Sequence, residues 1–339
     1  MNALYALVAI AVLLLIVYVG IAAAGLSAVF GIVVPYAAIA IFLLGFTWRI
    51  LKWARSAVPF RIPTTCGQEK SLPFIKNNNL EAPHNLLGVL GRMALEVLLF
   101  RSLFRNTKAE LRSDRRVVYG PDKWLWAAAL AFHWSFLIIF IRHYRFFAEP
   151  VPGFVLGLQS LDAFFQVGVP VLYLTDIVLL ASVTYLFLRR VMIPQIRYIS
   201  LATDYFPLTL ILAIGVTGVF MRHFYKVDIV LVKELTMGLV SFKPVVPDGI
   251  GFIFFAHVFL VSVLFAYFPF SKLMHLGGVF LSPTRNLVNN SRVKRHINPW
   301  NYDVKTHTYE EYEDEFRELM REAGLPLEKD TEIPLGKDA

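Results

Sequence analysis

The sequence predicts an all-α membrane protein, built as a bundle of six transmembrane helices with a cytoplasmic loop and a soluble C-terminal tail. Of its 339 residues, 57% are hydrophobic and only 17% are charged, whereas a soluble domain carries about 25% charged residues. No Lys, Arg, Asp or Glu occurs before Arg49. Lys and Arg outnumber Asp and Glu by 33 to 25, an excess that membrane proteins concentrate in cytoplasmic loops. These observations exclude an ordinary soluble enzyme, a disordered protein and a nucleic-acid-binding module.

Six stretches are long and apolar enough to cross a bilayer, which takes about 20 residues. We expect a two-helix N-terminal segment in 1–51, a cytoplasmic loop in 52–122, a four-helix core in 123–276 and a cytoplasmic tail in 277–339. A cleaved signal peptide is not expected, because no positively charged region precedes the first apolar run. The six spans are expected at residues 2–22, 28–50, 124–147, 163–188, 199–223 and 250–275.

The loops predict the orientation of these spans. Residues 52–122 contain 12 Lys or Arg and 6 Asp or Glu, and residues 189–200 contain three Arg and no acidic residue. The segments 148–162 and 225–249 show no such excess. By the positive-inside rule, both termini and the long loop lie in the cytoplasm, and the protein is a multi-pass protein of the cytoplasmic (inner) membrane.

Residues 86–104 are also apolar, but Arg92, Glu96 and Arg101 interrupt them. A charge that faces lipid at mid-membrane is costly, so we expect an interfacial or protein-covered helix and not a seventh span.

The tail contains a predicted acidic amphipathic helix at 309–323, which Gly324 ends. This helix is either solvated or a docking surface for a cytoplasmic partner.

The cysteine content limits the redox chemistry of the chain. A single cysteine, Cys66, cannot form an intrachain disulfide or a CxxCH haem attachment, and cannot hold a four-thiolate iron–sulfur cluster. Any redox centre must use other ligands or belong to a partner. We expect Cys66 itself to be a reduced thiol without a reactive role.

Four of the eight histidines lie in two predicted spans, His133 and His143 on the third, and His257 and His275 on the sixth. The two spans run in opposite directions, which pairs His143 with His257 near the outer face and His133 with His275 near the cytoplasm. Each pair can supply two neutral imidazoles as axial ligands to one haem iron. The sequence therefore predicts two b haems, stacked one per leaflet. Other metal ions are less favoured, because no carboxylate accompanies either pair.

The histidine spacing permits this arrangement without requiring it. Eighteen residues are five helical turns, so His257 and His275 share a face, while His133 and His143 lie about 80° apart. Axial rises of about 27 Å and 15 Å leave an offset of about 6 Å at each pair, which helix tilt can absorb. Pro269 is expected to bend the sixth span between its two ligands.

Several residues are candidates for supporting the haems. Haem propionates favour cations, and snorkelling to lipid headgroups explains the same residues equally well. Gly215 and Gly218 on the fifth span would allow close approach of a macrocycle or of another helix. The cationic candidates are Arg142, Arg145 and Arg222 at the outer haem, and Arg189, Arg190, Arg197 and Lys272 at the inner haem.

A quinol-oxidising site needs an apolar slot and a proton acceptor close to the outer haem. The candidates are His223, Gln166 and Asp162, with Gln159 as a further one. Asp176, expected near mid-membrane, is either a neutral carboxyl bonded within the bundle or a proton relay.

The two spans with His-x9-His and His-x17-His resemble those of the haem b subunit of respiratory nitrate reductase and its relatives. In that family these histidines ligate two b haems, which carry electrons between a quinol and a cytoplasmic iron–sulfur partner. The loop segments 63–73 (PTTCGQEKSLP) and 90–105 (LGRMALEVLLFRSLFR) resemble the DsrM branch, the membrane cytochrome b of the complex associated with dissimilatory sulfite reduction.

The resemblance implies menaquinone as the membrane substrate and a partner like the iron–sulfur catalytic subunit of heterodisulfide reductase. It also implies other subunits of the Dsr membrane complex, and a small sulfur-carrier protein as soluble substrate.

Three alternatives stay open from the sequence. The chain is the gamma subunit of a nitrate reductase-type respiratory complex, a haem-free proton-coupled transporter that uses the histidines and Asp176, or a structural anchor for a cytoplasmic complex. A transporter predicts internal repeats and colourless protein, and an anchor gives no reason for histidines inside the spans.

Overall fold

The computed structural model describes residues 1–56, 67–111, 113–166, 170–294, 303 and 305–329. Cys66 and the first residues of the 63–73 segment lie outside these ranges. The chain forms two compact units, Met1–Lys294 and Arg295–Ala339. The first unit is the membrane bundle, and it includes residues 277–294, which the sequence assigned to the tail.

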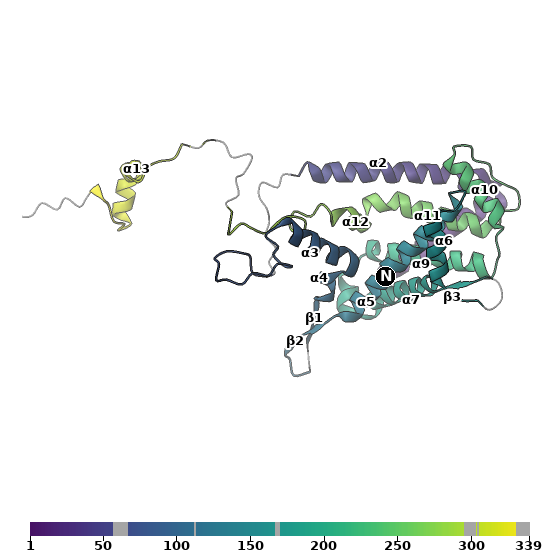
Figure 1. Cartoon of the computed structure of the whole chain (residues 1–339), viewed down its shortest axis with the longest axis horizontal. Coiled ribbons are helices and arrows are strands. Elements are labelled where there is room, and N and C mark those ends of the chain that lie inside the picture. Colours follow the sequence, from purple (N-terminus) through teal and green to yellow (C-terminus); the bar gives the residue numbers. More distant parts are fainter. Residues whose placement is uncertain (57–66, 112, 167–169, 295–302, 304, 330–339) are drawn as a thin grey trace, which may run out of the picture. The chain divides into compact units, whose positions relative to one another are not determined.

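Helices dominate the first unit (Figure 1). The N-terminal half contains α1 (Asn2–Tyr18), η1 (Val19–Ala23), η2 (Val29–Val33), α2 (Val34–Ala54), α3 (Leu86–Leu99), α4 (Arg101–Phe104), β1 (Thr107–Leu111), β2 (Val117–Pro121), α5 (Lys123–His143) and η3 (Tyr144–Phe146). The C-terminal half contains α6 (Gly153–Asp162), β3 (Ala163–Phe165), β4 (Leu172–Tyr173), α7 (Leu174–Met192), α8 (Pro194–Ile199), α9 (Ala202–His223), α10 (Ile229–Val240), α11 (Phe252–Tyr267), η4 (Phe268–Phe270), η5 (Lys272–Met274) and α12 (His275–Gly278).

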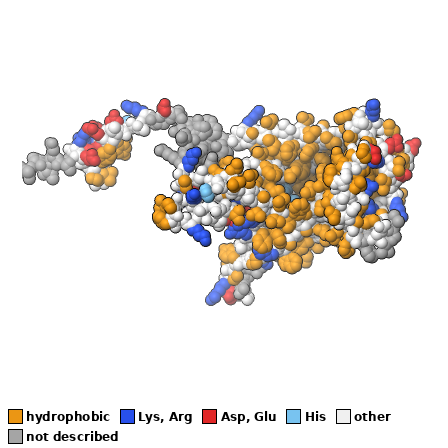
Figure 2. Space-filling model, viewed as in Figure 1, with side chains coloured by type: hydrophobic (Ala, Val, Ile, Leu, Met, Phe, Trp, Pro, Cys, Tyr) orange, Lys and Arg blue, Asp and Glu red, His pale blue; other side chains and the backbone are white. Residues whose placement is uncertain are grey.

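Five helices of the described chain are long and apolar enough to cross a membrane, which identifies a multi-pass membrane protein. They confirm five of the six expected spans. Figure 2 shows apolar side chains over the middle of the bundle, with charged side chains toward its ends. The five spans are Asn2–Ala23, Val29–Ala54, Lys123–Phe146, Ala202–His223 and Phe252–Phe270.

The expected fourth span, 163–188, is not a single helix. Its first part forms β3, which pairs antiparallel with β4, and α7 begins only at Leu174. Pro170 lies in the connection, and a proline in a helix interior would remove a hydrogen bond and clash with the preceding turn. The helix that follows packs against α5 and α9, but it is not among the five candidate spans. A sixth membrane crossing by α7 stays a prediction.

The helices pack in a connected order around α9 and α11. Helix α9 packs against α7, α1 and α11, and α11 in turn packs against α1 and α2. Buried clusters lie between these helices, one of which joins Ile10 of α1, Leu210 of α9 and Leu260 of α11. The histidine-bearing helices α5 and α11 are therefore held by the rest of the bundle.

The expected sixth span is broken where the sequence predicted a bend. Helix α11 ends at Tyr267, and Pro269 lies in the short 3₁₀ segment η4 that follows. His275 begins the separate helix α12. The five-turn argument for His257 and His275 is therefore wrong, because no continuous α-helix joins them. Proline lacks the N–H that an uninterrupted helix needs at this position.

Two short helices lie in segments that the sequence left as loops. Helix α6 occupies much of 148–162, and α10 lies within 225–249. Val232 and Leu235 of α10 are buried in the core cluster that also holds Phe254. These apolar contacts explain why the segment is folded onto the bundle.

The second unit confirms the predicted tail helix as α13 (Tyr309–Glu322). Thr308 and Glu311 form a reciprocal capping box at its start, and Gly324 has a positive φ of 67° just after its end. Glu313 is only 1% exposed, and its carboxylate accepts hydrogen bonds from the backbone N–H groups of Glu328 and Lys329. The segment after Gly324 therefore folds back onto the helix.

Candidate functional site

His143 and His257 lie next to each other although 114 positions separate them in the sequence. His143 ends α5, and His257 lies in the second turn of α11. Their ring centres are 6.3 Å apart, and their planes differ by 12°. The structure brings together the pair that the antiparallel order of the spans predicted.

His133 and His275 form a second pair. His133 is in the middle of α5 and His275 begins α12. Their ring centres are 5.9 Å apart, with planes that differ by 78°. The aromatic rings of Phe100 and Phe132 lie 4.9 Å and 4.8 Å from the His133 ring.

Three of these histidines have the same hydrogen bond at Nδ1. A carbonyl oxygen can only accept, so the proton must lie on Nδ1 and the lone pair on Nε2. A backbone contact of this kind fixes the tautomer and orientation of a metal-binding imidazole. The Nδ1 atoms of His133, His143 and His275 lie 2.7 Å from the Ala129 oxygen, 2.7 Å from the Ile139 oxygen and 2.9 Å from the Lys272 oxygen.

His257 reaches the same state through a side chain. Its Nδ1 lies 2.9 Å from Oγ1 of Thr217 on α9. The Thr217 hydroxyl has the carbonyl oxygens of Ala213 and Ile214 within 2.9 Å and 3.0 Å. Because the hydroxyl proton is directed to one of these carbonyls, Oγ1 accepts from the His257 Nδ1–H. All four histidines thus have Nε2 free of its proton.

These two pairs fit bis-histidine haem sites. Two imidazole–metal bonds of about 2 Å, plus the radii of the rings, separate two ring centres by about 6 Å across one metal ion. Both measured separations match this value. In the part of the chain that the structure describes, no three His, Cys, Asp or Glu side chains cluster as a bare metal ion would require. A haem needs only two protein ligands, because the macrocycle supplies the other four nitrogens.

Gly218 allows the His257 ring to lie against α9. A Cβ at Gly218 would lie 3.3 Å from Cε1 of His257, whereas a Cβ at Gly215 would meet Cδ2 of Leu180 at 3.0 Å. The two glycines therefore have different partners, the outer histidine for Gly218 and helix α7 for Gly215. The predicted close approach is present at both.

The opening spans support the outer pair. Phe254, Phe255 and Ala256, which precede His257, are buried in one cluster with Val17 of α1 and Phe30 of η2. No candidate redox ligand lies in these charge-free spans. They hold the start of α11 in place, a contact that hydropathy does not report.

Arg142 is engaged in a buried network that the sequence did not predict. Its Nε lies 3.0 Å from Oδ2 of Asp162, and its Nη2 donates to Oδ1 of Asp176 at 2.6 Å. The same Asp162 accepts hydrogen bonds from the N–H of Thr175 at 2.9 Å and from its hydroxyl at 2.6 Å. In the described contacts, Arg142 and Asp162 are therefore partners in a buried ion pair.

This network also corrects the position of Asp176. The sequence placed it near mid-membrane, but α7 begins at Leu174, so Asp176 lies in the first helical turn. A carboxylate is favourable there because of the exposed N–H groups of the first turn. Its partner Arg142 precedes His143 directly in the sequence.

The other two outer arginines are also partnered. Arg145 donates to Oε1 of Gln159 at 2.7 Å, and Arg222 donates from Nε to the Val171 oxygen at 3.1 Å. The guanidinium carbon of Arg222 lies 4.3 Å from the centre of the Tyr173 ring, and that of Arg142 lies 3.8 Å from it. Propionate binding by these arginines stays a prediction.

The inner cations have mixed surroundings. Arg189 forms an ion pair with Asp122 at 2.5 Å, and Lys272 forms one with Asp204 at 2.5 Å. Arg190 donates to the hydroxyl of Ser200 at 3.2 Å. Their assignment to the inner haem is also a prediction.

Among the quinone-site candidates, His223 differs in having a buried ring nitrogen that the described contacts leave free to accept a proton. Its Nε2 is buried and has no hydrogen-bond partner among the described residues. Asp162 is buried within the arginine network, and Gln166 is exposed after β3. These three side chains therefore have different surroundings, and the described contacts do not join them in one site.

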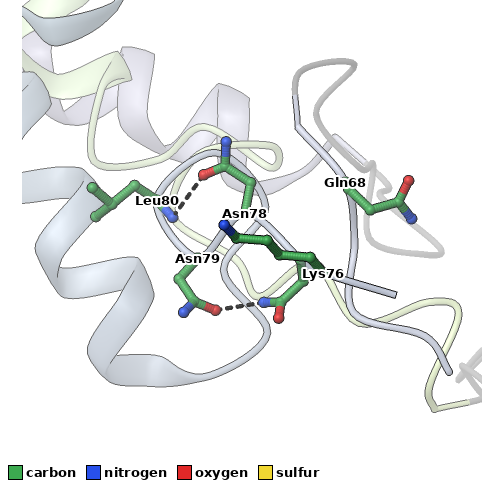
Figure 3. A pocket seen from close by; sticks show the side chains of 6 residues that line it. Gln68, Lys76, Asn78, Asn79 and Leu80 are labelled. Carbon is green, nitrogen blue, oxygen red and sulfur yellow. Dashed lines mark hydrogen bonds between the residues drawn. The ribbon is translucent and has the colours of Figure 1, made fainter. Parts of the chain in front are cut away.

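A pocket with a volume of about 500 Å³ lies elsewhere, in the loop before α3 (Figure 3). Asn77 donates to Asn79 at 2.5 Å, and the N–H of Leu80 donates to Asn78 at 3.3 Å. None of the four paired histidines lines this pocket. Its lining residues are Gln68, Lys76, Asn77, Asn78, Asn79 and Leu80.

Comparison with known proteins agrees with the geometry. A family model described as nitrate reductase gamma subunit matches residues 86–296, which include all four paired histidines. An Hdr-like menaquinol oxidoreductase cytochrome b-like subunit of Archaeoglobus fulgidus is 46% identical over 282 residues, covering 81% of this chain and 84% of the relative. A protein of the same description from Archaeoglobus profundus is 40% identical over 273 residues, covering 78% and 81%. The chain belongs to the nitrate reductase gamma subunit family.

Proposed function

We propose that this protein is a membrane cytochrome b that holds two b haems and passes electrons between menaquinol near the outer face and a cytoplasmic iron–sulfur partner. The observation that carries the proposal is the pair of histidine contacts, with ring centres 6.3 Å and 5.9 Å apart. The Nδ1 contacts leave each Nε2 available as a ligand. The printed description of the two relatives, menaquinol oxidoreductase cytochrome b-like subunit, favours the same substrate.

His143 and His257 would hold the outer haem, and His133 and His275 the inner haem. A bis-histidine haem supplies one-electron oxidation and reduction of its iron. The chain itself orients the four imidazoles, and it excludes water from His257 by the buried residues that precede it.

Oxidation of menaquinol to menaquinone releases two electrons and two protons. The chain must therefore accept protons near the outer histidines. His223, at the end of α9, has a buried Nε2 without a partner among the described residues. We assign it the role of proton acceptor, while Gln166 and Asp162 stay weaker candidates.

The partner must bring its own iron–sulfur clusters, because one cysteine cannot hold a four-thiolate cluster. The Hdr-like description of the relatives supports a partner similar to the catalytic subunit of heterodisulfide reductase. The resemblance of the loop segments to the DsrM branch supports a role of this complex in dissimilatory sulfur metabolism, with other Dsr membrane subunits as further partners.

The decisive experiment is a reduced-minus-oxidised spectrum of the full chain, purified from a haem-replete host, with haem measured by the pyridine haemochrome method. We expect a b-type spectrum and two haems per chain. Colourless protein would refute the proposal and favour the proton-coupled transporter. One haem per chain would refute the two-pair assignment.

The family match also favours a second candidate, the gamma subunit of a nitrate reductase-type complex. The subunit that co-purifies with the affinity-tagged chain separates the two. Dye-driven nitrate reduction by the purified complex would support the second candidate. An iron–sulfur partner that reduces a disulfide to two thiols with the two electrons of menaquinol, without nitrate reduction, would support the first.

A further inference from the structure

Helix α3 has its charged side chains on the inside and its leucines on the outside. Arg92 and Glu96 are 3% and 8% exposed, whereas Leu87 and Leu90 are 79% and 56% exposed. A helix on a water-facing surface shows the opposite pattern. The outer face of α3 therefore suits an apolar environment.

The inward charges are fully partnered by the protein. The guanidinium group of Arg92 donates to backbone oxygens of Glu81, Thr284, Arg285 and Leu287, at distances from 2.5 to 3.1 Å. Glu96 accepts hydrogen bonds from Ser102 and Arg285. These contacts remove the objection that Arg92 and Glu96 raise against an apolar location, because neither charge faces outward. Arg101 on α4, whose side chain is 24% exposed, is paired with Glu81.

The C-terminal end of α3 lies beside the middle of a membrane span. The carbonyl oxygens of Leu98 and Leu99 accept hydrogen bonds from the indole N–H groups of Trp134 (3.1 Å) and Trp126 (2.7 Å) on α5. Trp134 is eleven residues beyond Lys123, the start of α5, which corresponds to about 16 Å along the helix axis. Phe100, the next residue, contacts the ring of His133.

The chain then turns back toward the start of α5. Phe100 has a positive φ of 51° and separates α3 from the short helix α4. The Phe104 oxygen at the end of α4 accepts a hydrogen bond from Nζ of Lys123 at 2.6 Å. The segment thus reaches His133 at Phe100 and returns to the start of α5 at Phe104.

The last carbonyls of a helix have no intrahelical partner and are normally satisfied by water or caps. In hydrocarbon, water is absent and such groups must find partners in the protein. The two tryptophans of α5 supply these partners at Leu98 and Leu99.

We propose that α3 and α4 form a re-entrant membrane segment. It enters the bilayer from the end at which α5 begins, turns at Phe100 beside His133, and presents the leucine face of α3 to lipid acyl chains. The occupant of this face is lipid, because the face continues the exposed apolar surface of α5, where Trp134 and Leu137 are 42% and 45% exposed. A polar protein surface would not complement it.

The test places one nitroxide spin label at a time on the full chain in vesicles of phosphatidylcholine and phosphatidylglycerol, after replacement of Cys66 by Ser. Labels go on Leu90→Cys and, as a second outward position, on Leu87→Cys. Phe140→Cys on α5 is the membrane control, and Ser113→Cys in the β1–β2 turn is the aqueous control; both residues are exposed. Collision with oxygen and with a water-soluble nickel chelate is measured by electron paramagnetic resonance.

We expect the Leu90 label to behave as the Phe140 label does, with oxygen collisions several-fold above nickel collisions. A label that follows Ser113 would overturn the proposal, because α3 would then lie in water. A label shielded from both reagents would also overturn it, because protein would then cover the face. Either outcome leaves the assignment of the haems unaffected, since none of the labelled residues belongs to the histidine pairs.

Discussion

The Nδ1 atom of His257 lies 2.9 Å from the hydroxyl oxygen of Thr217 on the neighbouring helix α9. The other three paired histidines use backbone oxygens at the same position of the ring. His257 is thus the one member of the two pairs whose Nδ1 has a replaceable side chain as a partner, beside the backbone of Ile214.

Thr217→Val should raise the reduction potential of the outer haem. A hydrogen bond from Nδ1–H makes the imidazole a better donor to the metal and favours ferric iron, so its loss favours ferrous iron. A tenfold change in this preference equals about 59 mV for one electron, and we expect an upward shift of that order in a potentiometric titration. Thr209→Val is the matched control, because Thr209 is buried on the same helix and its described hydrogen bonds go to the oxygens of Tyr205 and Phe206. Equal shifts in both variants would contradict the assignment.

The pairing of the histidines predicts which haem each His→Ala variant loses. His143→Ala and His257→Ala should each remove the same haem, because each deletes one axial ligand of one iron. His133→Ala and His275→Ala should each remove the other. Haem content and low-temperature spectra of the four variants check this. Loss of two different haems from the first two variants would disprove the pairing.

Gly218→Ala should disturb the outer haem specifically. The new Cβ would lie 3.3 Å from Cε1 of His257, so the ring must move or the helices must separate. Gly215→Ala is the control on the same helix, because its Cβ meets the end of the flexible Leu180 side chain. We expect the electron paramagnetic resonance signal of one ferric haem to shift in the first variant and neither signal to shift in the second. A shift in both would indicate a general helix displacement.

Hydropathy predicted most of the bundle because long apolar runs report membrane helices directly. It failed at 163–173, where an apolar run forms β3 and β4, since composition alone does not separate a short strand from a helix. The break at Pro269 was predicted only as a bend. The histidine pairs followed from the antiparallel order of two spans, which needs no knowledge of side-chain contacts.

The supporting residues could not be predicted in the same way. Thr217 is a single hydroxyl in an apolar span, and no spacing rule points to it. The sequence does not show that Asp162 and Asp176 converge on Arg142, whose contact with a haem propionate stays a prediction. Such contacts depend on where α7 begins.

The tail helix offers a pH-dependent contact outside the membrane. A hydrogen bond from Lys329 lowers the pKa of Asp314, and the hydrogen bonds to Asp314 and Glu310 raise the pKa of Lys329. The contact therefore stabilises the folded tail above the ordinary Asp pKa of about 3.9 and below the ordinary Lys pKa of about 10.4. It is lost as the pH falls through the lowered Asp314 pKa or rises through the raised Lys329 pKa.

Lys329→Met should return the pKa of Asp314 toward its ordinary value. A carbon-13 NMR titration of the aspartate carboxyl groups in the full chain measures this change. Lys305→Met removes an exposed tail lysine outside the described contacts of Asp314 and is the control. An Asp314 titration that does not change in Lys329→Met would show that the fold-back contact is absent.

The buried network at Arg142 predicts the largest loss of stability. The side chains of Arg142, Asp162 and Asp176 are 9%, 4% and 14% exposed, so Arg142→Met leaves two carboxylates with little solvent and without the cation of their described ion pairs. Removing one partner of a buried ion pair costs about 3–5 kcal/mol, and thermal unfolding in detergent should show a clear decrease in Tm. Lys233→Met, which breaks the more exposed pair with Glu149, should cost no more than about 1 kcal/mol.

A triple variant separates this electrostatic cause from lost packing. Arg142→Met combined with Asp162→Asn and Asp176→Asn removes the uncompensated charges, so it should recover part of the lost stability. If the triple variant is no more stable than Arg142→Met alone, the loss comes from packing, for example from the contact of Arg142 with the Tyr173 ring. Such a result would remove the basis for treating the network as the electrostatic support of the outer end of α7.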